Sequence, residues 1–428
     1  MEAIHPYALW LIAIFVIGYT FITFEHVAKI NKATVALFTA VILWTLIFIA
    51  KGMEPAGIAT IFYEELANIS QVVFFLLGAL TVVEIVQAHD GFRIVSNVIR
   101  AKSKRSLLWL VGGIAFFLSS ILDNLTTTIV MLTILRTVIP ARRERLLFGG
   151  AVVIAANAGG AWTPIGDVTT TMLWIGGQLT TFTMMKELLL PSSLCLVISC
   201  TLLSLPLKGH FPPKELLPEN SSTGTKAILD PLGPLFFFLG IGLLISVPIF
   251  KIVTGMPPFM GMLFALSILW IITDLLHSSY ADRHHLRVPH ILSRIDLSGT
   301  LFFLGILLAV SALGAAGLLT ALAHWFDTAI GNTTIIAILI GLASAIVDNV
   351  PLVAATMGMY DTAIYPVDAP FWQLIAYCAG TGGSILVVGS AAGVVFMGIE
   401  KVDFFWYLRH ISLSALIGYL AGALLYAL

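Results

Sequence analysis

The stretch Ser119-Ser120-Ile121-Leu122-Asp123-Asn124-Leu125-Thr126-Thr127-Thr128 decides how this chain folds. Apolar runs flank it on both sides, so a carboxylate and an amide stand in the middle of a hydrophobic segment. A charged side chain in such a segment is costly in lipid and marks a functional position. The same pair returns as Asp348-Asn349, within Ser344-Ala345-Ile346-Val347-Asp348-Asn349-Val350-Pro351. The sequence therefore carries one polar interruption twice.

Each pair is followed by a glycine-rich interruption of another apolar segment. The first reads Asn157-Ala158-Gly159-Gly160-Ala161-Trp162-Thr163-Pro164-Ile165-Gly166-Asp167, and the second reads Gly380-Thr381-Gly382-Gly383-Ser384-Ile385-Leu386-Val387-Val388-Gly389-Ser390. Three glycines of the first superpose on three of the second at one constant offset. Interrupted hydrophobic segments at matching places of two halves are the best sequence-level pointer to a transporter's binding site.

The composition places the chain in a membrane. Of its 428 residues, 59% are hydrophobic and only 11% are charged, whereas soluble domains carry roughly 25% charge. We therefore predict an all-α polytopic membrane protein. Its three cysteines lie in apolar runs without a CxxC motif, so neither a disulfide nor a metal cofactor is indicated. The chain has no Walker motif, HExxH or nucleophile elbow, so we predict a protein that is not an enzyme and has no cofactor.

The first half, residues 1–206, divides into spans and interrupted segments. A helix needs about 20 apolar residues to cross the hydrocarbon core, and each arm of the segment 107–139 has only about 15. We interpret that segment as a re-entrant helical hairpin that enters and leaves on one side. The segment 146–178 is long enough to span but is broken by its glycines and Pro164. The uninterrupted spans are predicted near 7–24, 33–50, 69–89 and 187–206.

The second half, residues 232–428, repeats this order. The polar, proline-containing segment 207–231 is the predicted linker, and the basic residues place it in the cytoplasm. The second hairpin is predicted at 333–361 and the second broken helix at 371–399. Five spans per half is an odd number, so the two halves form inverted repeats. The remaining spans are predicted near 233–251, 258–277, 297–320 and 404–428.

The positions of the basic residues support this topology. With both termini outside, all of the 22 Lys and Arg residues except Lys51, Lys186 and Lys251 fall in inner loops or at inner ends. This bias agrees with the positive-inside rule. It also requires the first hairpin to return to the inner face, because basic residues flank it on both sides.

We expect the two hairpin tips and the two broken helices to meet at the midplane and to form a cation and proton site. The candidate residues are Asp123, Asn124, Asn157, Thr163, Asp167, Asp348, Asn349, Ser384 and Ser390. Nearly all offer oxygen, and no Lys or Arg is among them. Hard cations such as Na⁺ prefer oxygen ligands, whereas several carboxylates would repel an anion. The predicted Na⁺ ligands are Asp123, Asn124, Asn157, Asp348 and Asn349.

The carboxylates also suggest how transport is coupled. Burial and a neighbouring carboxylate both favour the protonated form of an aspartate. Protons and a metal ion would therefore compete for one site, and a carrier that rearranges only when loaded would exchange Na⁺, and also Li⁺, for H⁺. The alternative is a carrier of oxyanions or dicarboxylates. A channel is disfavoured, because paired inverted hairpins suit alternating access.

Several of these residues also have a purely structural interpretation. Asp123 and Asp348 could cap the second helices of their hairpins, and Asp167 could cap the helix that follows it. Asn124 and Asn349 could bond neighbouring backbone.

Two kinds of polar residue lie outside the predicted site. Glu84 is a lone intramembrane acid, either a proton relay or the partner of a polar group. The histidines in or beside one basic inner loop are expected on a solvated face, with a pH sensor as the minor interpretation. They are His277, His284, His285 and His290.

The run from Asn157 to Trp174 resembles the signature of NhaD-type Na⁺/H⁺ antiporters, and the wider resemblance, to the ion transporter superfamily, covers essentially the whole chain. Dicarboxylate carriers of that superfamily have Ser-Asn-Thr at the hairpin tips, where this chain has Asp123-Asn124 and Asp348-Asn349. The second break departs from the first, with Gly380 in place of Asn157 and Ser390 in place of Asp167.

The resemblance implies Na⁺/H⁺ antiport in a bacterial inner membrane, with roles in pH homeostasis and salt tolerance. It also implies a homodimer in which a transport domain moves against a scaffold like an elevator.

Overall fold

The computed structural model describes residues 7–23, 25–49, 55–99, 103–139, 141–210, 232–277 and 286–428. Within these ranges the chain is helical, with one isolated bridge between Ser103 and His210. Six of the described helices are long and apolar enough to cross a membrane, and the bent pair α20–α21 makes a seventh if it counts as one span. Helices form because a spanning segment must pair its backbone groups internally. The prediction of an all-α polytopic membrane protein is confirmed.

Some sequence-based predictions concern residues outside the described ranges. Most of the predicted linker 207–231 is among them, as are Lys51, His284 and His285.

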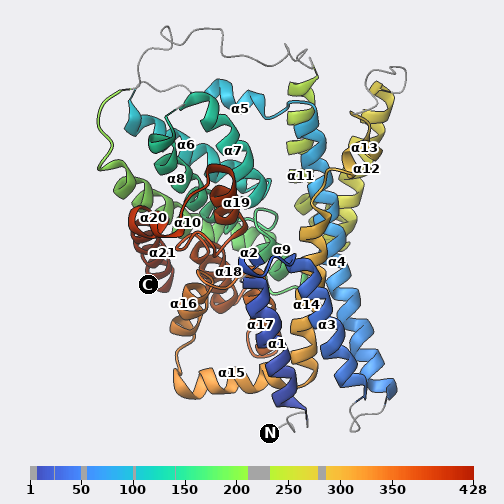
Figure 1. The fold of residues 1–428 in the computed structure, drawn as a ribbon. Helices are drawn as coiled ribbons and strands as arrows, with labels where there is room; N and C mark the ends of the chain where they lie inside the picture. Colours follow the sequence, from blue (N-terminus) through green and yellow to red (C-terminus); the bar gives the residue numbers. More distant parts are fainter. Residues whose placement is uncertain are drawn as a thin grey trace.

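The helices form two bundles that lie side by side (Figure 1). The scaffold bundle contains α1 (Ala8–Thr23), α3 (Lys32–Ile49), α4 (Pro55–Ala88), α11 (Gly233–Thr254), α12 (Pro258–His277) and α14 (Leu297–Ala315). The site bundle contains α6 (Lys104–Ser119), α7 (Asn124–Val138), α8 (Arg142–Gly160), α9 (Val168–Ile175), α10 (Thr181–Ser204), α16 (Thr333–Ala343), α17 (Asn349–Met359), α18 (Pro370–Gly382), α19 (Ala391–Glu400), α20 (Phe404–His410) and α21 (Ser412–Ala427). The short connectors are α2 (Glu25–Ala28), α5 (Arg93–Val98), α13 (Val288–Leu292) and α15 (Leu318–Ala329).

Two helices of the scaffold bundle, α4 and α14, hold it against the site bundle. α14 packs on α3 and α12 packs on α4, while α14 also contacts α17 and α4 contacts α9. One end of the molecule, the α15 end, carries α15 and the start of α1. The opposite end, the α13 end, carries α5 and α13 (Figure 1).

The two hairpins lie in opposite halves of the site bundle. α6 and α7 lie toward the α13 end, whereas α16 and α17 lie toward the α15 end (Figure 1). The first pair is interrupted by residues 120–123 and the second by residues 344–348. Each hairpin packs against a broken helix, α6 on α8 and α16 on α18. All four interruptions therefore face the middle of the bundle.

The same close contacts occur at both hairpins. The Ser119 hydroxyl donates to the carbonyl oxygen of Ala156 (2.6 Å), and the Ser344 hydroxyl donates to that of Ala379 (2.9 Å). Each bond ties the end of a hairpin's first helix to the first half of a broken helix. Because buried polar groups must be paired, these bonds fix both tips at their broken helices.

Glycine permits the close approach that these bonds need. A Cβ atom on Gly159 would overlap the backbone of Phe116 in α6, and one on Gly382 would overlap the backbone of Gly341 in α16. Both neighbours are backbone atoms of a packed helix, which cannot move aside as a flexible side chain would. The two glycines therefore occupy matching positions in the two halves.

We expect Gly159→Ala to lower the thermal unfolding temperature in detergent, because overpacking of this kind typically costs about 1–3 kcal/mol. Gly113→Ala is the matched control, since a Cβ atom there meets no atom within 4 Å. That change adds a better helix former to α6 and should leave the protein as stable or slightly more stable. Equal unfolding temperatures for the two variants would contradict the proposed close packing.

Three spans differ from the sequence-based prediction. α4 begins at Pro55, well before the predicted position 69. The span predicted at 297–320 ends at Ala315, because Gly317 takes the left-handed conformation (φ 73°) and turns the chain into α15. That helix lies across the α15 end (Figure 1). The last span, predicted at 404–428, is bent by 55° between α20 and α21.

The expectation of a solvated face is wrong for His277. Its side chain is fully buried, and its Nε2 lies 2.9 Å from the Nε2 of His89. The His89 ring also stacks on Phe236 of α11. The two histidines therefore join the ends of α4 and α12 inside the scaffold bundle. His290, by contrast, is exposed.

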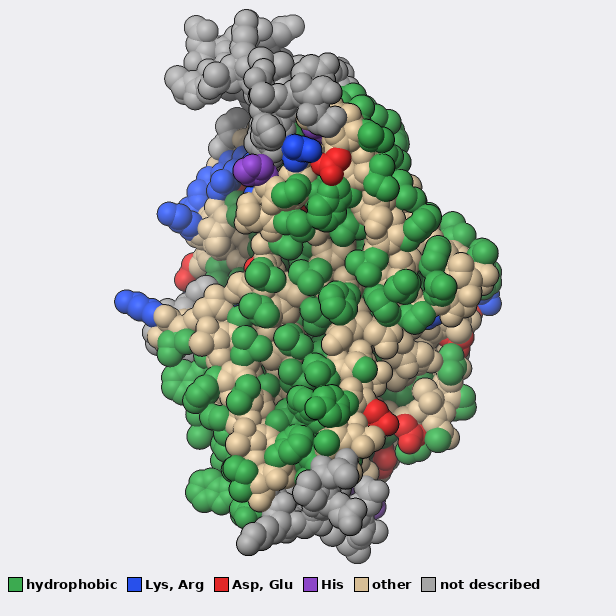
Figure 2. All heavy atoms as spheres, turned by 90° about the vertical axis from the view of Figure 1, so that its right-hand side faces the viewer, with side chains coloured by type: hydrophobic (Ala, Val, Ile, Leu, Met, Phe, Trp, Pro, Cys, Tyr) green, Lys and Arg blue, Asp and Glu red, His purple; other side chains and the backbone are tan. Residues whose placement is uncertain are grey.

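The scaffold side of the molecule suits a lipid environment. Hydrophobic side chains are spread over the whole face in Figure 2, and the charged side chains lie mostly toward its margins. Exposed apolar residues lie on several helices, such as Phe38 on α3 and Phe264 on α12.

Candidate functional site

Four half-helices begin at the centre of the site bundle, and each begins at a predicted site residue. These residues accept a hydrogen bond from a backbone amide in the first turn, as favoured N-caps do. The bonds run from Thr126 to Asp123 (2.6 Å), from Thr169 to Asp167 (3.1 Å), from Val350 to Asp348 (3.3 Å) and from Gly393 to Ser390 (3.2 Å). The structural interpretation of the three aspartates as caps is therefore confirmed. The positive ends of four helix dipoles also point toward one region.

Asp167 lies at the centre of this region. Asp167 is only 2% exposed, and one of its carboxylate oxygens caps α9. The other oxygen accepts hydrogen bonds from two amides, Asn124 Nδ2 (3.1 Å) and Asn349 Nδ2 (3.4 Å). These asparagines are the first residues of α7 and α17. The tips of both hairpins thus meet at one carboxylate oxygen.

A second pair of bonds extends the cluster to the other broken helix. Asn124 Nδ2 also donates to Asn157 Oδ1 (2.9 Å), and Asn157 Nδ2 donates to Ser390 Oγ (2.9 Å). Together with Asp167 and Asn349, these residues form the Asp167 cluster. The five side chains come from both hairpins and both broken helices, and all five are buried. Buried side chains linked in this way hold one another in place.

Asp123 and Asp348 lie at the edge of this cluster. Both are partly buried, and both interact electrostatically with Asp167. Asp123 also accepts a bond from the Thr126 hydroxyl (2.8 Å). The backbone N–H of Asp348 donates to the hydroxyl of Tyr19 in α1 (3.1 Å), so the second tip touches the scaffold bundle. Three carboxylates are therefore gathered in one region.

Thr163 and Ser384 hold the breaks by bonds to backbone. The Thr163 hydroxyl donates to the Ser120 carbonyl (2.6 Å), and the Ser384 hydroxyl donates to the Thr381 carbonyl (2.6 Å). The hydrogen bonds described for them do not join them to the Asp167 cluster.

Glu84 lies apart from the Asp167 cluster, on α4 in the scaffold bundle, where its electrostatic partner is Arg294. This arrangement favours the interpretation of Glu84 as a partner of a polar group. Its role as a proton relay stays a prediction.

The sequence reasoning missed two residues beside Asp348. Tyr19 and Lys32 line a cavity of about 80 Å³ together with Asp348 and Ser390. The Lys32 ammonium lies 4.4 Å from the centre of the Phe302 ring, so it stacks on an aromatic face. The only sequence signal for Lys32 was its place at the start of a span.

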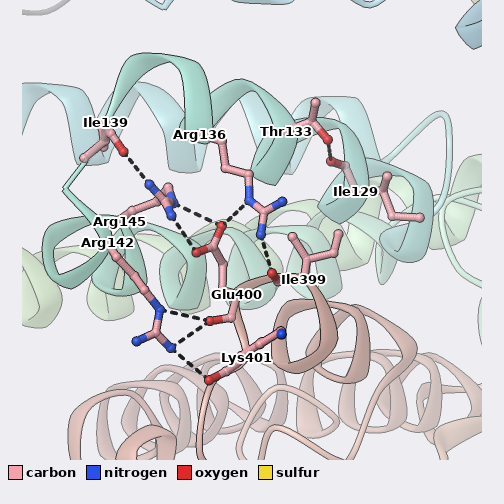
Figure 3. A network of polar contacts seen from close by, with 9 residues as sticks. All are labelled: Ile129, Thr133, Arg136, Ile139, Arg142, Arg145, Ile399, Glu400 and Lys401. Carbon is pink, nitrogen blue, oxygen red and sulfur yellow. Dashed lines mark hydrogen bonds and ion pairs between the residues drawn. The ribbon is translucent and has the colours of Figure 1, made fainter. Parts of the chain in front are cut away.

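A second missed feature is a cluster of ionic contacts at the end of the first hairpin that is remote from its tip (Figure 3). Glu400 ends α19 and is 2% exposed. Arg145 of α8 donates to both of its carboxylate oxygens, each at 3.0 Å, and Arg136 of α7 donates to one of them at 2.8 Å. Arg142 donates to its backbone carbonyl (2.9 Å). This Glu400 cluster ties α7 and α8 of the first half to α19 of the second.

The chemistry of the Asp167 cluster favours a cation as ligand. Helix N-termini bind anions readily when they are bare. Here aspartates occupy three of the four helix N-termini, where an anionic group would otherwise bind. The carboxylate, amide and hydroxyl oxygens that remain are ligands for a hard cation.

Comparison with known proteins gives a family model and several similar sequences. Residues 19–380 match the family model described as citrate transporter. Sodium/proton antiporter 1 of Arabidopsis thaliana is 54% identical over 96% of this chain and 71% of its own length. Sodium/proton antiporter 2 of the same plant is 51% identical, over 96% and 97%. The Na⁺/H⁺ antiporter NhaD of Halomonas elongata is 30% identical, over 97% and 87%. The chain belongs to the NhaD-type Na⁺/H⁺ antiporter family.

Membership of the NhaD-type family makes this chain a multi-pass membrane transporter. The relatives come from a plant as well as from bacteria, so they do not support the bacterial inner membrane in particular.

Proposed function

We propose that this chain exchanges Na⁺, and also Li⁺, for H⁺ by alternating access, with the cation and protons competing for the aspartates of the Asp167 cluster and its edge. One observation carries the proposal. Amides from the tips of both hairpins donate to the same oxygen of Asp167. A cation arriving at this oxygen would displace both amide N–H groups, and rotation of each amide would then offer its oxygen as a ligand.

The competition follows from charge. Three carboxylates gathered in one region repel one another, and a positive counter-charge relieves that repulsion. Protons supply that charge when the site has no cation, and Na⁺ supplies it after the protons leave. If only the neutralised forms rearrange, each crossing carries either protons or a cation. The net result is exchange of one for the other.

The proposal includes the repeat and hairpin architecture. The matching contacts of the two hairpins and their opposite placement in the site bundle support two inverted repeats with re-entrant tips near the midplane. The separation into a scaffold bundle and a site bundle supports motion of the second against the first. The homodimer implied by the resemblance, the outer position of both termini and the bacterial inner membrane stay predictions.

A second candidate cargo is a carboxylate anion, which the matched family's description favours. The two cargoes are separated in liposomes that contain the purified protein and are acidic inside. We expect uptake of radiolabelled Na⁺ that is abolished when a protonophore collapses the gradient. Uptake of labelled citrate or succinate should stay at the level of protein-free liposomes. Uptake of either anion, with no uptake of Na⁺, would overturn the proposal.

A further inference from the structure

A large cavity lies between the two bundles on the side of the site toward the α15 end. Its volume is about 560 Å³, which would hold a cation with its hydration shell at about 30 Å³ per water. One wall is α4 and α14 of the scaffold bundle, and the other is the ends of α9 and α17 in the site bundle. Asp167 caps the first of these two helices and Asn349 is the first residue of the second, so the cavity and the site lie along the same pair of helices.

The lining of the cavity suits water better than lipid. Several polar side chains face it, although such groups are costly in hydrocarbon. They are Glu65, Asn68, Gln71, Gln178 and Ser311. Glu65 is the one charged residue among the described residues that line the cavity, and it is partly exposed. Asn68, one turn further along α4, is exposed, so the cavity opens at this place.

An apolar layer separates the cavity from Asp167. Met172 of α9 and Leu307 of α14 line the cavity and also belong to a buried hydrophobic cluster that includes Val350 and Leu76. Val350 directly follows Asn349 of the Asp167 cluster. The layer therefore lies in the seam where site bundle and scaffold bundle meet. A shift of one bundle against the other would open or close it.

We propose that this cavity is the aqueous vestibule through which cations reach and leave the site from the α15 end, and that Glu65 draws cations into it. The inference rests on the proposed function for the identity of the cargo. A carboxylate at a partly enclosed mouth attracts cations and repels anions over several ångströms, because low-dielectric walls focus its field. No hydrogen bond or ion pair described for Glu65 joins it to the Asp167 cluster, and no residue of that cluster lines the cavity, so Glu65 acts on the supply of cations and not on their coordination.

The test uses a cysteine inside the cavity, Ser311→Cys, in protein purified in detergent. The cysteine is modified with a positively charged and with a negatively charged methanethiosulfonate of similar size. Each modification rate is divided by the rate at which the same reagent modifies a small free thiol in solution. The three natural cysteines are buried, and the parent protein gives their background. We expect the cationic reagent to be favoured at least about threefold, as one nearby charge would produce.

Glu65→Gln in the Ser311→Cys background should remove this preference. Glu64→Gln is the matched control, because Glu64 is the adjacent acid on α4, is exposed, and does not line the cavity. It should retain the preference. A cysteine at 311 that reacts with neither reagent would show that the cavity is closed to water and would overturn the proposal. A preference that survives Glu65→Gln would overturn the role of Glu65.

The same variants give a transport readout. Glu65→Gln should raise the KM for Na⁺ supplied from the α15 end about threefold and leave kcat unchanged. The thiol measurement needs no transport and no knowledge of the cargo. If Na⁺/H⁺ exchange were absent while the charge preference at 311 depended on Glu65, the proposed function would fail and the vestibule would stand.

Discussion

Asp167→Asn should reduce Na⁺/H⁺ exchange in liposomes by at least about tenfold, which corresponds to about 1.4 kcal/mol. The substitution removes the charge at the one oxygen to which both hairpin tips donate. Asparagine has nearly the same shape, but it cannot release a proton when Na⁺ arrives. The variant therefore loses both the charge that holds the cation and the proton that is exchanged for it.

The folded structure should survive this change. The side-chain oxygen of asparagine can still accept the bond from the Thr169 amide, and asparagine is as good an N-cap as aspartate. The substitution also removes a buried charge, which is unfavourable in itself. We therefore expect an unfolding temperature close to that of the parent. Loss of exchange in a folded protein separates the role of Asp167 in transport from its role as a cap.

Asp403→Asn is the matched control for this experiment. Asp403 caps α20 through the backbone amide of Trp406 (3.2 Å), but it is exposed and lies outside the Asp167 cluster. The Asp403→Asn variant should exchange Na⁺ for H⁺ at the rate of the parent protein. Full activity in Asp167→Asn, measured beside this control, would leave Asp167 with a capping role only and would remove the basis of the proposed mechanism.

The sequence was sufficient to locate the interruptions, because each carries a signal of its own. A carboxylate followed by an amide is costly in the middle of a lipid-facing helix, so the pair indicates a break. Asp123 and Asp348 both cap new helices in the structure. The glycines of the two broken segments were equally visible. Their physical role, close approach to the backbone of a hairpin, appears only in three dimensions.

The order of importance within the site could not be predicted. From the sequence, Asp123 and Asp348 were the first candidates, because they are repeated. Coordination and capping were equally good interpretations of Asp167. Asp167 has no aspartate at the matching place in the second half, where Ser390 stands. Its central position depends on contacts to Asn124 and Asn349, which are distant in sequence, and no local pattern encodes such contacts.

The burial of polar groups between segments distant in the chain could not be predicted from the sequence either. His277 and Glu400 stand next to basic or polar residues in the sequence and would be expected near solvent. Each is buried by a partner from the other half of the chain, His89 in one case and Arg145 in the other. Such pairs become visible only when the helices that carry them are packed.

Glu400→Gln should destabilise the protein strongly, by about 3–5 kcal/mol, as expected when one partner of a buried ion pair is removed. The Glu400 side chain is 1% exposed, and it compensates the charge of Arg145, whose side chain is 11% exposed, and that of Arg136, which is half exposed. Glutamine keeps the size of the side chain and one acceptor oxygen, so the loss measures charge and not packing. Thermal unfolding in detergent should show a large decrease in the unfolding temperature.

Glu144→Gln is the matched control, because Glu144 pairs with Lys104 at 2.6 Å but is about one third exposed. Exposed ion pairs contribute roughly 0–1 kcal/mol, so this variant should unfold close to the parent. Similar stability losses in the two variants would contradict a special role for burial at Glu400.

The position of Glu400 makes its loss more than a local defect. Its partners lie on α7, which begins at Asn124, and on α8, which carries Asn157 near its end. Glu400 itself ends α19, the helix that Ser390 caps. The Glu400 cluster therefore fixes one end of three helices whose other ends form the Asp167 cluster. A site bundle that moves as one body needs such a connection between its two halves.

We therefore expect Glu400→Gln to bind Na⁺ more weakly and to show a higher KM, although the Glu400 side chain lies outside the Asp167 cluster. The assay is run at a temperature at which the variant is still folded. An unchanged KM in the folded variant would show that the cluster contributes to stability alone.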